Sequence, residues 1–142
     1  MTNPPPAPPS PDGAPLLLTD ADVLDRVRQL VGPAVTDRQL WLLFVDGDGR
    51  QSPVVVPVAG IPERPNPGGL AGLDAVLAQV RDDLATDLGA GSVVLALERL
   101  GPDATLPGDR DWARVLTDCC TGAEIELRGI FLSTRGGVRR LR

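Results

Sequence analysis

Four acidic residues with the chemistry of a general acid, a general base or a cation ligand flank one short segment of the chain: Glu98, Asp103, Asp109 and Asp111. The segment follows an apolar run that is typical of a strand and precedes a helical pattern, which is where α/β proteins place ligand sites. Two carboxylates there could transfer protons or hold a divalent cation. Asp103 equally suits a turn, and Asp109 or Asp111 suits a helix start. We interpret Asp109 as a cap and Glu98, at the end of the strand, as the stronger functional candidate.

The two cysteines of the chain are adjacent, at Cys119 and Cys120. Adjacent cysteines close no useful disulfide loop, and metal sites generally need wider spacing and a second pair. Trp112, Val115, Leu116 and Cys119 recur at helical spacing, so Cys119 is expected in the core. Cys120 is then expected to be partly exposed, with a reactive thiol at Cys120 as the less favoured alternative.

The segment Asp46-Gly47-Asp48-Gly49 has the composition of a calcium loop or of a hairpin turn. A twelve-residue calcium loop that begins at Asp46 needs an acidic twelfth residue, and this position holds Pro57. The sequence therefore predicts a turn between two strands.

Composition excludes several kinds of chemistry. The 142 residues include 14 arginines but no lysine, histidine or tyrosine, and the formal net charge is −5. Without histidine there is no imidazole base or imidazole metal ligand, and without lysine there is no Schiff base. The acidic balance argues against nucleic-acid binding, and no apolar run is long enough for a membrane helix. We expect a cytoplasmic protein, and the arginine-only, Ala/Gly/Pro-rich usage is typical of a GC-rich, actinobacterial-type bacterial genome.

The hydrophobic pattern predicts a disordered Pro-rich tail over residues 1–15 and a single α/β domain over residues 16–142. The domain is expected to hold a single mixed β-sheet flanked by helices. Thr19 should cap the first helix, which ends at Gly32. The other expected elements are strands 40–45 and 54–58, a helix over 70–88, a strand over 92–97, a helix that carries Trp112 to Cys119, and strands 126–132 and 138–141.

The segment ERLGPDATLPGDRD, residues 98–111, resembles in its spacing the signature of the JAMM/MPN metalloproteases, and of their RadC-like branch in particular. That signature is His-x-His, seven residues, Ser, two residues and Asp, between a buried strand and a helix. The segments WLLFVDGDGRQ and EIELRGIFL and the helix over 70–88 resemble the elements around it. The resemblance covers residues 36–142 and implies a JAMM/MPN-like fold. A cytidine-deaminase-like layout is the alternative, because its sheet shares much of this pattern.

The residues that carry the chemistry in that family are largely replaced. The resemblance implies two zinc-binding histidines where this chain has Glu98 and Leu100, a serine where it has Gly108, and a base where it has Arg38 or a near neighbour. Only the metal-binding aspartate is kept, as Asp111. A leucine cannot bind a metal, and an arginine opposes cation binding electrostatically. The resemblance therefore implies a pseudoenzyme with no catalytic residues, no metal and no cofactor.

Our first hypothesis is a non-catalytic JAMM/MPN-like binding or scaffolding module that takes a protein partner or forms a homodimer. Its vestigial cleft would be lined by Arg38, Glu98, Arg99 and Asp111, with an arginine–carboxylate ion pair in place of the metal.

Two alternatives remain open: a hydrolase-type enzyme with an altered site built on Glu98 and Asp111, with or without magnesium or manganese, and a small-ligand-binding regulatory domain. Convergence of Glu98 and Asp111 in an open pocket would favour the enzyme. Leu100 and Trp112 filling that space would oppose it.

Overall fold

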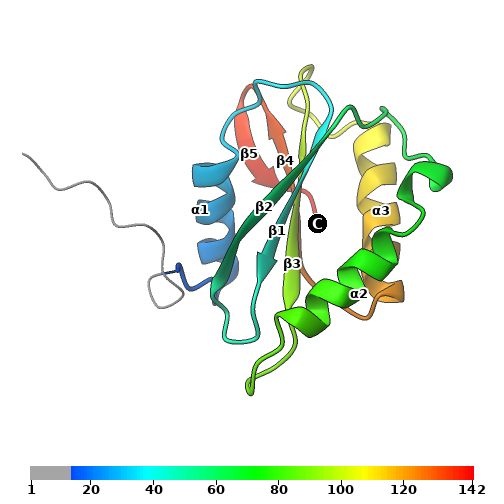
Figure 1. The fold of residues 1–142 in the computed structure, drawn as a ribbon. Helices are drawn as coiled ribbons and strands as arrows, with labels where there is room; N and C mark the ends of the chain where they lie inside the picture. Colours follow the sequence, from blue (N-terminus) through cyan, green and yellow to red (C-terminus); the bar gives the residue numbers. More distant parts are fainter. Residues whose placement is uncertain (1–13) are drawn as a thin grey trace, which may run out of the picture.

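The computed structural model describes residues 14–142, which form one mixed five-stranded sheet between helices (Figure 1). The strands are β1 (Gln39–Val45), β2 (Gln51–Ala59), β3 (Ser92–Glu98), β4 (Glu126–Thr134) and β5 (Gly137–Arg140). They lie in the order β2-β1-β3-β4-β5. Only β3 and β4 are parallel, and the other neighbours are antiparallel. The expected α/β class with one mixed sheet is confirmed.

Within residues 14–142, three α-helices and one 3₁₀ helix accompany the sheet. Helix α1 (Asp20–Leu30) lies on one face, and α2 (Leu73–Asp83) and α3 (Pro107–Gly122) lie on the other (Figure 1). The short helix η2 (Pro67–Leu70) precedes α2. Helix α3 is the crossover between the parallel strands β3 and β4, as such a pair requires.

The core has two parts because the sheet is covered on both faces. One cluster joins β1, β3 and β4 to α2 and α3, and the other joins the opposite face of the same strands to α1. Every residue of β3 is buried. As the sequence predicted, the runs of β1 and β3 are apolar at nearly every position because both faces of these strands are covered.

The start of the domain follows the local signals in the sequence. The Thr19 hydroxyl accepts from the Asp22 amide at 3.1 Å, and the Asp22 carboxylate accepts from the Thr19 amide, which completes a capping box. Of the expected Pro-rich tail, residues 1–13 lie outside the described residues. Pro15 is already attached to the sheet, since its carbonyl accepts from the Gln51 amide at 2.9 Å.

The predicted turn at Asp46 is confirmed. The Asp46 carboxylate accepts from the amides of Asp48 and Arg50 at 2.9 and 3.0 Å, which holds the reversal between β1 and β2.

The predicted helix over 70–88 is wrong at both ends. A left-handed glycine, Gly72 with φ of 89°, separates η2 from α2, and α2 ends at Asp83. Thr86 and Gly89 then form a tight turn through reciprocal backbone hydrogen bonds of 2.7 and 3.1 Å. Leu88 follows the helical spacing in the sequence but is 79% exposed at this turn.

Candidate functional site

Glu98 is the last residue of β3, and its buried carboxylate accepts hydrogen bonds from the segment before β1 and from β1 itself. One oxygen accepts from the backbone amides of Val35 and Thr36 at 2.8 and 2.9 Å. The other accepts from the indole N–H of Trp41 at 3.0 Å. Glu98 thus fixes the segment that leads into β1, and its side chain is only 2% exposed.

Arg99, the next residue, forms a buried ion pair with Asp109 in the first turn of α3. Its Nε donates to one carboxylate oxygen at 2.8 Å and a terminal nitrogen donates to the other at 2.7 Å. The guanidinium also donates to the carbonyls of Leu100, Pro102 and Ala104. Both charged side chains are almost fully buried. The pair therefore anchors the loop between β3 and α3.

Asp109 also caps α3, because its carboxylate accepts from the Leu106 amide at 2.8 Å. Burial alone would raise the pKa of this carboxyl. The hydrogen bonds from Arg99 and Leu106, together with the nearby charges of Arg99 and Arg38, outweigh burial and lower the pKa of Asp109. Its hydrogen bonds to Asp109 raise the pKa of Arg99. Both groups are thus held in their charged forms, and the interpretation of Asp109 as a cap is confirmed.

The space around these residues is nearly filled. Three of the four residues expected in the vestigial cleft, Arg38, Glu98 and Arg99, line one void, which holds only about 10 Å³. Asp109 and Trp112 line the same void. Arg38 lies 3.9 Å from the Asp37 carboxylate, so its ion pair is with Asp37 and not with the expected Glu98 or Asp111.

The structure does not bring Asp111 into this cluster. Its carboxylate pairs with Arg64 and, at 3.5 Å, with Arg114, at the outer side of α3. Asp111 and Glu98 share no partner among the hydrogen bonds and ion pairs of residues 14–142. Leu100 lies at the edge of the cluster, where its amide donates to Asp37 at 3.2 Å.

The segment between β2 and η2 closes over the start of α3. The Trp112 indole N–H donates to the Pro62 carbonyl at 3.0 Å. A Cβ atom on Gly108 would lie 2.6 Å from the Glu63 carbonyl oxygen, so there is no room for a serine at this position without movement of the backbone. Arg64, on the same segment, pairs with Asp111.

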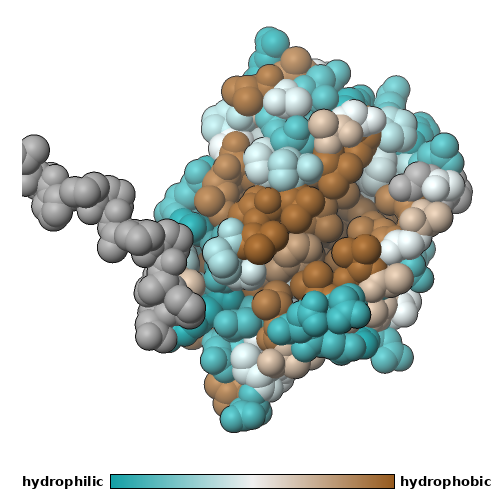
Figure 2. Space-filling view, viewed as in Figure 1, coloured by the Kyte–Doolittle hydropathy of each residue, from teal (hydrophilic) through white to brown (hydrophobic). Residues whose placement is uncertain are grey.

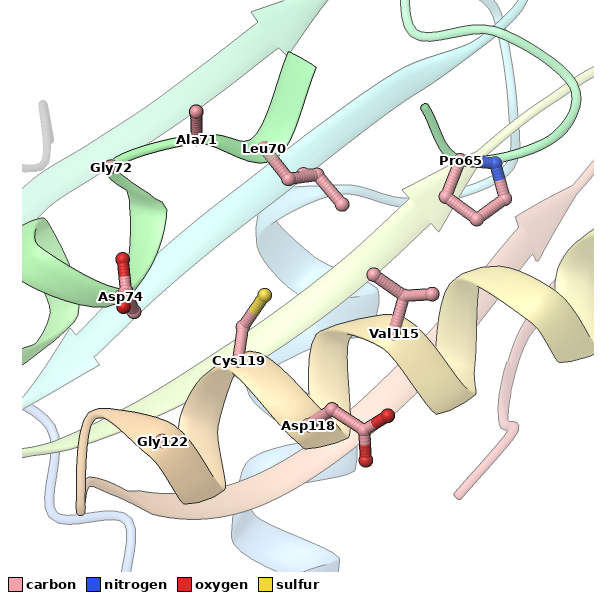
Figure 3. Close-up of a pocket in the computed structure, with 9 residues that line it drawn as sticks. All are labelled: Pro65, Leu70, Ala71, Gly72, Asp74, Val115, Asp118, Cys119 and Gly122. Atoms are coloured by element: carbon pink, nitrogen blue, oxygen red, sulfur yellow. The ribbon is translucent and has the colours of Figure 1, made fainter. Parts of the chain in front are cut away.

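The expected positions of the two cysteines are reversed. Cys120 is buried at 2% exposure, whereas Cys119 is partly exposed. Burial raises the pKa of the Cys120 thiol to about 11, which disfavours the reactive thiolate. Cys119 lines a shallow pocket of about 390 Å³ between η2, α2 and α3 (Figure 3), and burial together with Asp74 and Asp118 raises its pKa as well.

An open apolar groove, which sequence analysis missed, lies between the β1–β2 half of the sheet and α2. It holds about 630 Å³. Figure 2 shows it as a hydrophobic band across the face of the molecule. None of its fifteen lining residues is charged: Leu40, Leu42, Val56, Val58, Ala59, Gly60, Ile61, Pro62, Asn66, Leu70, Ala71, Gly72, Leu73, Val76 and Trp112.

The groove exists because the helices cover only part of this face. Helices α2 and α3 pack on each other, on β3 and β4 and on the buried side chains of β1, and the face of β2 is left open. Val56 and Val58 of β2 and Val76 of α2 are consequently exposed large hydrophobic residues on the two walls. The signal in the sequence was the run from Gln51 to Pro62, twelve residues without a charge.

The protein is an α/β domain with one mixed five-stranded sheet. It has a nearly filled polar cluster of Glu98, Arg99 and Asp109 at the end of β3, and an open apolar groove. Among residues 14–142 no helix is long and apolar enough to cross a bilayer. Within the same residues no three potential ligands gather in a way that could hold a metal ion. No protein-family model matches the chain, and no curated protein or solved structure is significantly similar to it.

Proposed function

We propose that this protein is a non-catalytic, JAMM/MPN-like binding or scaffolding module of the bacterial cytoplasm, and that its binding surface is the apolar groove between β2 and α2. The observation that carries the proposal is the groove itself: an open channel of about 630 Å³ whose lining holds no charged side chain. Large apolar side chains that stay exposed in one concave region, with no charged residue among them, are a feature of protein interaction sites.

The polar cluster at the end of β3 supports the non-catalytic part of the proposal. The hydrogen bonds of Glu98, Arg99 and Asp109 are made to one another, to backbone atoms or, for Glu98, to the Trp41 indole, around a void of about 10 Å³. A general acid or base needs room for a substrate within hydrogen-bonding reach. The carboxylate-based alternative gains no support from Glu98 and Asp111, because their partners differ.

The proposal is tested by affinity isolation of partners from a lysate of the source organism with three forms of the full chain as bait. Val56→Asp places a charge on the groove wall. Leu88→Asp is the matched control, since Leu88 is an exposed apolar residue that does not line the groove. We expect at least one protein, which can be the endogenous chain itself, to be retained by the wild type and by Leu88→Asp and lost with Val56→Asp. Equal retention by all three baits would refute the groove as the binding surface.

A further inference from the structure

We propose that the occupant of the groove is a second copy of this chain, docked about a two-fold axis so that α2 of each copy covers the open face of β2 in the other copy. This inference rests on the proposed function of the groove and names its partner.

The first argument is the missing layer. On this face α2 and α3 cover β3, β4 and the buried side chains of β1, and the face of the edge strand β2 is left without a helix. The opposite wall of the groove also exposes an apolar side chain, because Val76 on α2 is 54% exposed. A two-fold axis satisfies both deficits at once, because in such an interface each contact between two different residues occurs twice. Val76 of one copy would pack on Val56 and Val58 of the other.

The second argument is charge. The chain carries a formal charge of −5, so two copies meet most favourably through surfaces that bring no acidic side chains into contact. The groove lining has no charged residue, and Asn66 is the most polar side chain among the fifteen described residues that line it. A partner selected by opposite charge would be expected to face acidic residues here. A neutral, apolar surface is instead complementary to itself.

The third argument excludes pairing through the free edge of β2. The backbone N–H of Gln51 points away from β1 and donates to the Pro15 carbonyl. Pro53 and Pro57 lie further along the strand, and neither has an N–H to donate. Prolines at such positions are a common protection of edge strands, because they remove the outward donors that a further strand would need. Around β2, a second copy is therefore expected on the face of the strand rather than along its edge.

The size of the surface sets the expected strength. Fifteen lining residues are fewer than the roughly 20–30 residues that each partner contributes to an interface of standard size. We therefore expect a reversible dimer with a dissociation constant in the micromolar range, visible by sedimentation velocity or light scattering when the concentration of the full chain is raised from low micromolar to several hundred micromolar.

The decisive experiment uses two variants that place opposite charges on the two walls. Val56→Asp and Val76→Lys should each weaken self-association by about tenfold or more, since a charge that enters an apolar interface loses hydration without gaining a partner. An equimolar mixture of the two variants should recover a dimer. In the mixed pair one contact joins the new aspartate at position 56 to the new lysine at position 76, and the other joins the native valines. Leu88→Asp should dimerise like the wild type, and circular dichroism checks that every variant is folded.

Three results would overturn the inference. A wild-type chain that stays monomeric at several hundred micromolar excludes a second copy as the occupant. Loss of the dimer in Leu88→Asp as well would place the contact elsewhere. A mixture that fails to dimerise, while the wild type does, excludes this pairing of residues 56 and 76. If the wild type is monomeric but the Val56→Asp bait still fails to retain a lysate partner that the wild-type bait retains, the homodimer is refuted and the proposed function stands. If Val56→Asp reduces neither self-association nor the retention of lysate partners, both proposals are refuted.

Discussion

Replacing Asp109 by asparagine should destabilise the fold far more than the same change at Asp111, two residues further along α3. The asparagine side chain would keep the shape of the aspartate but leave the buried guanidinium of Arg99 without its counter-charge. Removing one partner of a buried ion pair costs about 3–5 kcal/mol. The three carbonyl groups that Arg99 also contacts soften this cost without replacing the charge.

The control has the same chemistry at a more exposed position. Asp111 pairs with Arg64 and Arg114, whose side chains are 62% and 67% exposed. Ion pairs of this kind contribute about 0–1 kcal/mol, because water and salt screen them. The two aspartate-to-asparagine changes share a helix and a change in charge, so the difference between them reports the buried setting of Asp109, which includes its cap contact with Leu106.

The assay is urea unfolding followed by circular dichroism, at a protein concentration below the onset of self-association. With a slope of about 2 kcal/mol per molar urea, typical of a small domain, the Asp109→Asn midpoint should fall by about 2 M and the Asp111→Asn midpoint by about 0.5 M or less. A folded domain has a total stability of about 5–15 kcal/mol, so the first loss is large but measurable. Midpoints that agree within error for the two variants would refute the assignment of Arg99 and Asp109 as the anchor of the β3–α3 loop.

Three further predictions concern the same residues and their neighbours. The pKa of folded Asp109 lies below the value of about 3.9 for an unfolded aspartate, so its carboxylate stabilises the fold above about pH 4, and this contribution is lost as the pH falls through the lower folded pKa. The unfolding free energy should therefore fall more steeply with acid in the wild type than in Asp109→Asn. Parallel curves for the two proteins would contradict this. Glu98→Gln should lower the free energy of unfolding by about 1–3 kcal/mol and alter the fluorescence of Trp41, because the NH₂ end of an amide cannot accept the hydrogen bonds that a carboxylate oxygen accepts. Unchanged stability and emission would show that those hydrogen bonds are dispensable. A thiol reagent should label native Cys119 slowly and Cys120 only on unfolding; rapid labelling of the native Cys119→Ser variant would contradict the burial of Cys120.

Much of the fold could be predicted because its signals are local. The capping box at Thr19, the turn at Asp46 and the uniformly apolar strands each depend on a few adjacent residues. The alternation of strands and helices then leaves few arrangements other than one sheet between helices. The end of α2 was missed because Leu84 and Leu88 continue the helical spacing, although the turn at Thr86 ends the helix before Leu88 is reached.

The face of α3 could not be settled from spacing alone. Both Trp112-Val115-Leu116-Cys119 and the observed stripe of Trp112, Ala113, Leu116 and Cys120 fit a helical period. The two differ by a small rotation about the helix axis, and periodicity has no power to choose between them. The choice is made by tertiary packing, in which Ala113 and Cys120 meet the sheet while Val115 and Cys119 face η2.

Three of the four residues expected in the vestigial cleft lie together in the structure, but around a nearly filled void and with partners other than the expected ones. Glu98 was selected from its place at the end of β3 and Arg99 as part of the cleft that the resemblance implies, and both belong to the polar cluster there. The partner of Arg99 is Asp109, ten residues on and across a loop, and no rule of spacing links such a pair. Asp111, which the resemblance favoured, points to Arg64 on a different segment.

The two regions of this protein differ in what a ligand would have to displace, and this difference is the strongest reason to place binding in the groove. At the end of β3 a ligand must break hydrogen bonds of Glu98, Arg99 or Asp109, and each group so released would be left buried without a partner. In the groove the walls carry almost no polar groups, so an apolar occupant displaces only water from Val56, Val58 and Val76. The two regions should therefore respond independently to mutation: once corrected for the fraction of folded protein, Asp109→Asn should leave self-association unchanged, and Val56→Asp should leave the urea midpoint measured below self-association within about 0.5 M of the wild type. A loss of self-association in folded Asp109→Asn protein would show instead that the polar cluster is coupled to the binding surface.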